Sequence, residues 1–166
     1  AAIVEFPGVL YRSGAEQKIR KYLIDNNYVD TVIQLPPDLF FGTGIATCII
    51  VLKKSKKDNA TLFIDASTEF VRGGNKNKLT EPNRKKILNA FVERKDIAHF
   101  ARLVPNSDIA ENDYNIAVSS YVEQENTTEE VNIEKLNAHI AEIVIRQNKL
   151  RTAIDAIVAD LEGVSA

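Results

Sequence analysis

The chain has 166 residues, of which 45% are hydrophobic and 27% charged, as in an ordinary globular protein with one sizeable core. Its net charge of −2 argues against a free-standing nucleic-acid-binding domain, which is usually basic, so any contact with DNA must be local. The single cysteine, Cys48, excludes an internal disulfide and fits a reducing cytoplasm. No apolar run approaches the roughly 20 residues of a membrane span, so we expect no membrane contact.

The first ten residues predict a buried strand that enters a turn at Pro7 and Gly8. A chain that begins inside a core strand and contains no methionine is expected to be a fragment of a longer protein. Residues 1–10 therefore predict that part of the fold lies outside this sequence.

A helix is predicted from the capping-box pair Ser13 and Glu16 to about residue 26. Ile19, Tyr22 and Leu23 recur at helical spacing, so we expect this face to pack inward. The helix would separate the first strand from the second.

Two further strands are predicted on either side of a loop. Residues 29–35 are rich in β-branched side chains, and Pro36 and Pro37 end this run because proline cannot continue a β-ladder. Residues 45–52 form an unbroken apolar run, which predicts a strand buried on both faces. The loop is tight enough for these two strands to pair antiparallel. The predicted order of elements, which is strand, helix, strand, loop and strand, indicates an α/β fold.

The loop between these strands carries the most informative residues of the chain. An enzyme that modifies a base takes it out of the stack, and stacking of a base on an aromatic ring is worth about 1–3 kcal/mol. Glycines beside such a ring allow close approach of the backbone to a ligand. We predict a target-base pocket at Phe40, Phe41, Gly42, Thr43 and Gly44. The alternative is that both phenylalanines only plug the strand ends.

From residue 60 on, the pattern predicts an α+β segment. Residues 61–64 predict a strand, residues 72–78 a polar, mobile loop and residues 80–94 a helix. That helix should direct Ile87, Leu88, Phe91 and Val92 inward. A strand over 100–104, a helical turn over 108–112 and a turn over 112–115 follow.

The C-terminal segment has the most regular periodicity. Spacings of three and four alternate over about four heptads, which predicts a helix over residues 132–162 with an a/d seam. The seam consists of Ile133, Leu136, Ile140, Ile143, Gln147, Leu150, Ile154, Ile157 and Leu161. Thr127 with Glu130, or Asn132, would cap its start, and Gly163 would end it. Such a helix needs a partner, either the same domain or a helix of another protein.

No complete catalytic constellation is evident in the sequence. Neither His99 nor His139 lies at metal-ligand spacing from another histidine or a cysteine, so we expect no metal site. The Gly42-Thr43-Gly44 run lacks the lysine and the following helix of a phosphate-binding loop.

Four cations near the first helix are candidates for contacts with DNA phosphates: Arg12, Lys18, Arg20 and Lys21. A second cluster lies at residues 53–57. Each of these side chains, taken singly, is also typical of a solvated face.

Recognisable patterns lie in five segments, at residues 6–12, 14–23, 32–49, 63–70 and 112–115. Among them are Leu35-Pro36-Pro37 and Asn112-Asp113-Tyr114-Asn115. In this order they resemble the modification (methyltransferase) subunit of type I restriction–modification systems. The resemblance covers nearly the whole chain.

That resemblance implies transfer of a methyl group from S-adenosylmethionine to adenine N6 in DNA, on a Rossmann-like fold. The family's glycine-rich cofactor loop and its catalytic Asn-Pro-Pro-Phe motif are absent here. The chain therefore resembles the C-terminal part of such a subunit, with no catalytic residue and no cofactor site of its own. Phe40 matches the position that stacks on the flipped adenine in related amino-methyltransferases, and Phe41 matches it less well.

The expected architecture is α/β and has three parts. Residues 1–58 would be the last strands and helix of the Rossmann-like fold, residues 59–125 an α+β extension and residues 126–166 a long heptad helix. The resemblance implies that this helix docks the specificity subunit of a complex that also contains a restriction subunit and DNA.

Two other functions remain open at this point. In one, the α/β part is only a platform, and the chain is a non-catalytic module that binds partners through its C-terminal helix. In the other, the chain is part of an RNA-modifying methyltransferase, because stacking on an extruded base is shared by both classes.

Overall fold

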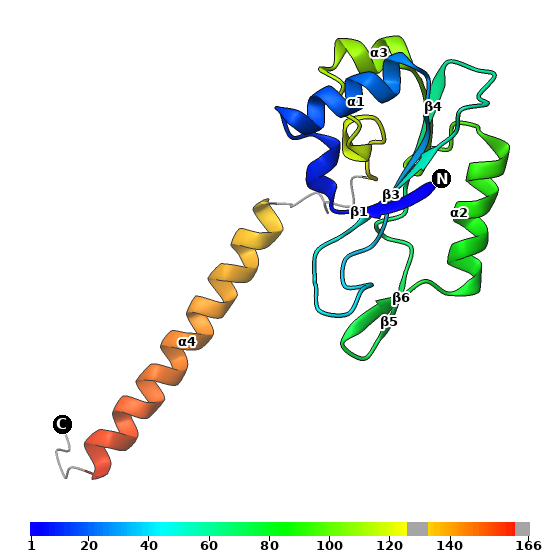
Figure 1. The fold of residues 1–166 in the computed structure, drawn as a ribbon. Coiled ribbons are helices and arrows are strands. Elements are labelled where there is room, and N and C mark those ends of the chain that lie inside the picture. Colours follow the sequence, from blue (N-terminus) through cyan, green and yellow to red (C-terminus); the bar gives the residue numbers. More distant parts are fainter. Residues whose placement is uncertain (126–132, 162–166) are drawn as a thin grey trace. The chain divides into compact units, whose positions relative to one another are not determined.

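The computed structural model describes residues 1–125 and 133–161 (Figure 1). The chain divides into two units, residues 1–125 and residues 126–166. The first unit is built on a five-stranded mixed sheet, and the described part of the second is a single helix. No helix in the described ranges is long and apolar enough to cross a membrane.

The sheet has the spatial order β1-β3-β2-β4-β7. Its strands are β1 (Ala2–Glu5), β2 (Val29–Gln34), β3 (Cys48–Leu52), β4 (Ala60–Asp65) and β7 (Ala101–Pro105). β2 and β4 pair in parallel, whereas the three other pairs are antiparallel. β5 (Val71–Gly73) and β6 (Lys76–Lys78) form a separate two-stranded hairpin.

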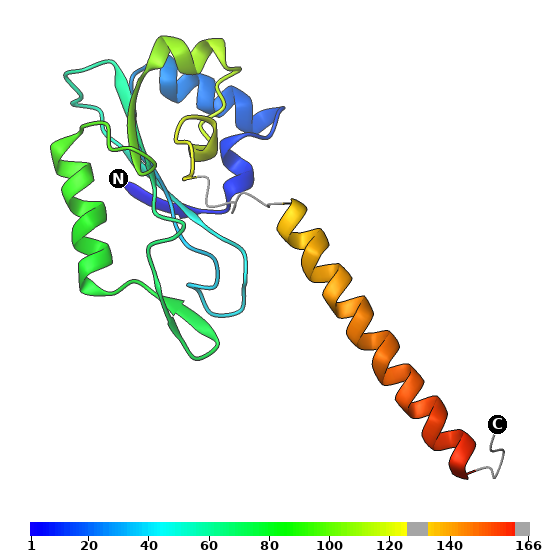
Figure 2. The same ribbon diagram turned by 180° about the vertical axis from the view of Figure 1, so that it is seen from behind.

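Helices cover both faces of the sheet (Figures 1 and 2). One face carries α1 (Ala15–Asp25), α3 (Asn106–Glu111) and the 3-10 turns η1 (Pro7–Leu10) and η2 (Val118–Ser120). The other face carries α2 (Glu81–Glu93). The central strands β2 and β4 are therefore buried on both sides, whereas the sequence predicted burial on both faces for residues 45–52, which the structure does not confirm.

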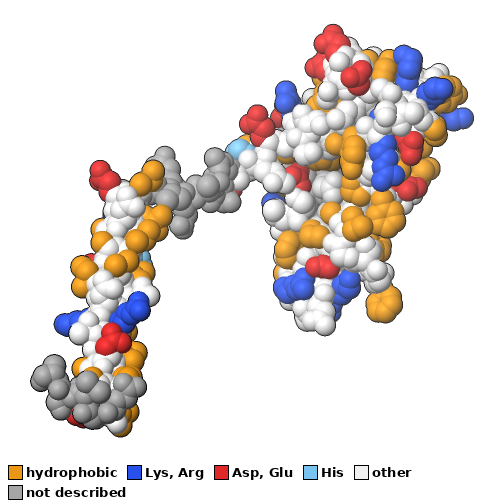
Figure 3. Space-filling view, turned by 90° about the vertical axis from the view of Figure 1, so that its left-hand side faces the viewer, with side chains coloured by type: hydrophobic (Ala, Val, Ile, Leu, Met, Phe, Trp, Pro, Cys, Tyr) orange, Lys and Arg blue, Asp and Glu red, His pale blue; other side chains and the backbone are white. Residues whose placement is uncertain are grey.

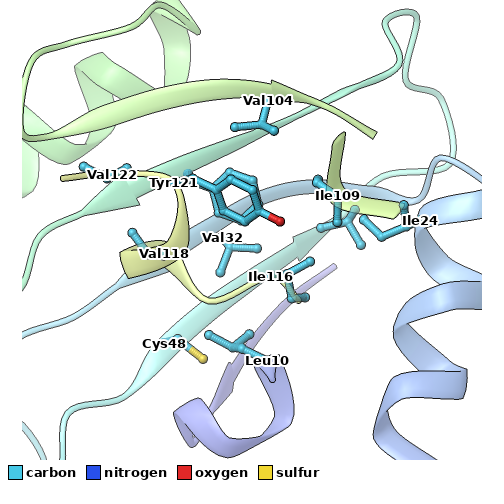
Figure 4. Packing of buried hydrophobic residues seen from close by; sticks show 12 residues of the cluster. Leu10, Ile24, Val32, Cys48, Val104, Ile109, Ile116, Val118, Tyr121 and Val122 are labelled. Atoms are coloured by element: carbon cyan, nitrogen blue, oxygen red, sulfur yellow. The ribbon is translucent and has the colours of Figure 1, made fainter. Parts of the chain in front are cut away.

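Alternate residues of the central strands point into two separate hydrophobic cores, one on each face of the sheet. Val32 and Phe63 point to the α1 side, where Tyr121 stacks on Phe63 with ring centroids 4.3 Å apart (Figure 4). Ile33 and Ile64 point to the α2 side. The thiol of Cys48 lies in the first core, where burial raises its pKa to about 11, so it is a core residue and not a reactive thiol.

The two outer strands differ in whether the backbone groups on their outer edge already have hydrogen-bond partners. At β7, the Asp96 carboxylate accepts the Leu103 N–H at 2.8 Å, Ala101 pairs with Ile97, and Pro105 has no N–H to offer. At β1, Ala1 and Leu52 exchange both hydrogen bonds, so Ala2 and Val4 direct their peptide groups away from β3. The edge of β7 is closed and that of β1 is open.

Most predicted elements are confirmed. β2, β4, β7 and α2 occupy the expected residues, and β2 and β3 are antiparallel. β3 begins only at Cys48, and most of it is half-buried because the strand beyond it, β1, is an edge. The predicted boundary between residues 58 and 59 separates strands of a single sheet, since β2 pairs with β4.

The N-terminal predictions were partly wrong. β1 is largely exposed rather than buried, because it lies at the edge of the sheet. Ser13 forms no capping box: α1 starts after Gly14, whose φ of 86° suits glycine, and no side chain caps it. Ile19 and Tyr22 are exposed, and α1 instead buries Arg20 and Ile24.

Two predictions in the later segment also needed correction. Leu88 and Val92 are exposed on α2, which packs through Ala90 with Ile87 and Phe91 beside it. Residues 72–78 are not a mobile loop but most of the β5–β6 hairpin, in which Gly74 takes the positive φ of 65° that its tight turn requires.

The described part of the second unit is α4 (Ile133–Leu161). The apolar side chains of the predicted seam are exposed, from 49% for Leu136 to 82% for Leu161. The capping residues predicted at 127–132 and Gly163 lie outside the described residues.

A buried arginine ties three segments of the first unit together. The Arg20 side chain is 4% exposed, and its guanidinium donates to the carbonyl oxygens of Tyr114 at 2.7 Å and Val9 at 2.9 Å. Burial lowers the pKa of Arg20, and the nearby Glu16 opposes that shift. Arg20 thus links α1 to the segment after β1 and to the turn at 112–115.

We expect Arg20→Ala to lower the free energy of unfolding by about 2–4 kcal/mol, because two buried carbonyls lose a charged donor. Urea denaturation followed by circular dichroism measures this loss. Lys18→Ala, on the exposed side of the same helix, should stay within about 0.5 kcal/mol of the parent. Equal stabilities of the two variants would contradict the structural role of Arg20.

Candidate functional site: the loop after β2 and its supporting hairpin

The loop at residues 35–47 leaves the carboxyl end of β2. β4 is parallel to β2, with Gln34 opposite Asp65, so the segment after β4 leaves from the same edge. In open α/β sheets, ligands bind outside the carboxyl ends of parallel strands, where such loops meet. The predicted target-base residues therefore lie where this fold builds sites.

The loop presents its two phenylalanines differently. Phe40 is 41% exposed, whereas Phe41 is fully exposed. Gly42 adopts a φ of 80°, which favours glycine, and a Cβ at Gly44 would stand 3.2 Å from the Asp38 carboxylate. The structure thus brings Phe40, Phe41, Gly42, Thr43 and Gly44 together on one short segment.

Asp38 anchors the loop electrostatically to the β5–β6 hairpin. Its carboxylate lies 3.1 Å from the Arg72 guanidinium and 3.8 Å from the Lys76 ammonium. Asp38 also adopts a left-handed φ of 57°, which is uncommon for a residue other than glycine. The ion pairs help to hold this strained position in place.

Asn77 supplies the buried part of the same anchor. Its side-chain amide donates to the Pro37 carbonyl at 2.9 Å, and its backbone N–H donates to the Asp38 carbonyl at 3.0 Å. Arg72 donates to the Asn77 side-chain oxygen at 3.1 Å, and Lys76 donates to the Thr43 carbonyl at 2.9 Å. The hairpin therefore contacts the loop on both sides of Phe40 and Phe41 (Figure 1).

Sequence reasoning missed these hairpin residues. The available signal was the Gly73-Gly74-Asn75 turn between Val71-Arg72 and Lys76-Asn77, a pattern of a short hairpin. No sequence feature indicated that Asp38 and Asn77 would meet, because the contact joins segments almost 40 residues apart.

The base of the loop contains one unusual polar group. The Thr47 hydroxyl is buried without a hydrogen-bond partner among the described residues. The backbone beside it is well paired, since Leu35 N–H and the Gln34 amide both donate to the Thr47 carbonyl.

The predicted phosphate-contacting cations lie on or beside α1 rather than in the loop. The Arg12 guanidinium folds over Gly8, and Lys18 is exposed. The Lys21 ammonium donates to the Tyr114 hydroxyl at 2.7 Å, which raises the pKa of Lys21, and it pairs with Asp25 at 3.2 Å. In the described ranges, no hydrogen bond or ion pair joins these cations to the loop.

Arg20 differs from the other three cations. Its guanidinium is buried and donates hydrogen bonds to two carbonyl oxygens, so it stabilises the fold. That Arg12, Lys18, Arg20 and Lys21 contact phosphates stays a prediction, and Arg20 is the one buried side chain among the four. Among the described residues, no cluster of histidine, cysteine, aspartate and glutamate could hold a metal ion.

Comparison with known proteins assigns the family. The sequence model described as N-6 DNA methylase matches residues 1–130. The chain belongs to the N-6 DNA methylase family.

Three relatives of this chain are informative. It is 50% identical over 98% of its length to the type I restriction enzyme MpnII methylase subunit of Mycoplasma pneumoniae, and covers 30% of that protein. It is 32% identical over 98% of its length to the MjaVII methylase subunit of Methanocaldococcus jannaschii, and covers 29% of it. A crystal structure of the type I restriction-modification methyltransferase subunit from Streptococcus thermophilus is 48% identical, with a TM-score of 0.72 over 74% of this chain and 26% of that one.

These comparisons confirm the resemblance to type I modification subunits that the sequence predicts. They also support a mixed α/β fold like that of the known subunits. The chain spans about 30% of the length of the curated relatives it matches.

We expect Asn77→Ala to lower the free energy of unfolding by about 1–3 kcal/mol, because the Pro37 carbonyl and the Arg72 guanidinium each lose a partner. Urea denaturation measures the change. Asn75→Ala is the matched control, since Asn75 lies exposed in the hairpin turn. If both variants are equally stable, Asn77 does not anchor the loop.

Proposed function

We propose that this chain is the C-terminal part of a type I DNA methyltransferase subunit that methylates adenine N6, and that the loop after β2 forms one wall of its target-base pocket. The observation that carries this proposal is an aromatic pair on a loop that Asp38 and Asn77 hold rigid at the carboxyl end of β2. A base extruded from DNA needs such a fixed aromatic surface. The identity to known methylase subunits supports the choice of reaction.

Phe40 is the stacking residue in this proposal. Its ring is partly packed and therefore has fewer orientations to lose when a base binds, whereas Phe41 is fully exposed. Gly42, Thr43 and Gly44 would shape the rim of the pocket, because the glycines let the backbone come close to the base. Arg12, Lys18 and Lys21 would approach phosphates of the DNA.

In this proposal the S-adenosylmethionine site is formed by other parts of the full-length subunit. No described turn from a strand into a helix carries a cluster of glycines, and Gly42 and Gly44 lead into β3 rather than into a helix. The cofactor site and the Asn-Pro-Pro-Phe motif would lie elsewhere in the full-length subunit. In this proposal residues 1–58 complete a larger Rossmann-like sheet, and the open edge of β1 supports that continuation.

We expect Phe40→Ala in the full-length subunit to slow adenine methylation about ten- to a hundredfold, which is the loss of one stacked base. The assay is transfer of a labelled methyl group to duplex DNA in the assembled enzyme. Val92→Ala, which removes an exposed apolar side chain from α2, should leave the rate unchanged. Normal turnover of Phe40→Ala would refute the stacking role.

We assign α4 the docking of the specificity subunit within a complex that also contains the restriction subunit and DNA. The exposed seam supports this role, because apolar area removed from water contributes about 25 cal/mol per Å². Gln147, the one polar residue of the seam, would fix the register against a partner helix. A cytoplasmic location is part of the same proposal, because DNA is the substrate.

We expect Leu150→Asp to abolish co-purification of the subunit with its specificity subunit, as deletion of residues 126–166 should. Lys149→Asp places the same charge on the neighbouring position of the helix but outside the seam, and should leave the complex intact. Retained binding by both the Leu150→Asp and the deletion variants would exclude α4 as the docking element.

A further inference from the structure

The hairpin and the loop it supports together form a surface of exposed apolar and basic side chains. We call it the hairpin surface; it consists of Phe41, Phe70, Val71, Arg72, Lys76 and Lys78. Arg72 pairs with Asp38 at 3.1 Å and Lys76 donates to the Thr43 carbonyl at 2.9 Å, so the hairpin is joined directly to the loop. Figure 3 shows hydrophobic and basic side chains side by side at the lower end of the first unit, where the hairpin lies in Figure 1.

This surface is locally positive although the whole chain is slightly acidic. The hairpin carries three cations, of which Arg72 and Lys76 share the single carboxylate of Asp38, so these four side chains together have a net charge of +2. The Lys78 side chain packs its methylene groups along Gly73, since a Cβ there would stand 3.0 Å from Lys78 Cε. No described carboxylate pairs with the Lys78 ammonium, which is exposed.

The aromatic component is equally specific. Phe41 is fully exposed although water disfavours an apolar ring, and the anchored loop fixes its backbone. Aromatic rings interleaved with cations are typical of surfaces that bind single-stranded nucleic acid, where bases stack and phosphates pair. A duplex hides its base faces, so it offers Phe41 nothing to stack on.

We infer that the hairpin surface binds the DNA strand beside the extruded adenine, with Phe41 stacked on a base face that the extrusion uncovers and Lys78 opposite a phosphate. This inference rests on the proposed function, in which extrusion of the adenine locally opens the duplex. It gives the two adjacent phenylalanines separate tasks: Phe40 holds the target base, and Phe41 holds a neighbouring base. Arg72 and Lys76 position the loop and add positive charge.

The test is fluorescence anisotropy of a labelled oligothymidylate of about 12 nucleotides, with the full-length subunit and without cofactor. Phe41→Ser should weaken binding about tenfold. Lys78→Gln should make the slope of log affinity against log salt shallower by about 0.7, the value for one phosphate contact on a single strand. Both variants change exposed side chains, so the fold should be unaffected.

Matched controls are Val92→Ser, at an exposed apolar position on α2, and Lys95→Gln, at an exposed lysine just after the end of α2. Each should bind oligothymidylate like the parent. If Phe41→Ser and Lys78→Gln also bind like the parent, the inference is overturned. It is likewise overturned if Lys78→Gln weakens binding of polyglutamate as well and Phe41→Ser has no effect, which would indicate an acidic protein partner.

The outcome is separable from that of the proposed function. If Phe40→Ala loses methylation while the hairpin variants bind oligothymidylate like the parent, only this inference is refuted. If Phe40→Ala methylates normally while both hairpin variants bind oligothymidylate more weakly, the single-strand surface is upheld and the proposed target-base pocket is refuted.

Discussion

The parallel pairing of β2 with β4 is the constraint on which the candidate site depends. Both strands are buried on both faces, and their register places Gln34 opposite Asp65. Because the strands run in the same direction, the loop after β2 and the chain after β4 leave from one edge. Segments 34 residues apart thereby become neighbours, and the Asp38 carboxylate pairs with Arg72. An antiparallel pair would have sent these two segments to opposite ends of the sheet.

The aromatic loop is held by polar contacts in addition to the apolar packing of Leu35 and Leu39 in the core on the α2 side. Asn77 is buried with its amide on the Pro37 carbonyl, and its own side-chain oxygen accepts from Arg72. Each group in this small network is satisfied by another, which is the condition under which buried polar groups add specificity. The loop can therefore expose Phe41 without losing its shape, and the left-handed conformation of Asp38 is sustained by its two cations.

Local patterns predicted the central elements well. β2 and β4 follow from short runs rich in β-branched and apolar side chains, and α2 follows from helical spacing, because the interior selects for those patterns directly. The prediction failed where a distant segment decides the outcome. Arg20 is polar by composition, yet it is buried because the Val9 and Tyr114 carbonyls converge on it. Phe40 and Phe41 could be recognised from the sequence as a site, but their support by the hairpin required long-range contacts that no local pattern contains.

The unequal edges of the sheet have a consequence for handling this chain by itself. At β7 a carboxylate, a short bridge and a proline leave little backbone for another strand to use. At β1 the outward peptide groups of Ala2 and Val4 are flanked by exposed Ile3 and Val4 side chains. A strand with free hydrogen-bonding groups and an apolar flank is a template for self-association. Concentrated preparations of residues 1–125 should therefore dimerise or aggregate through β1, and a proline or lysine at Val4 would be the change that keeps them monomeric.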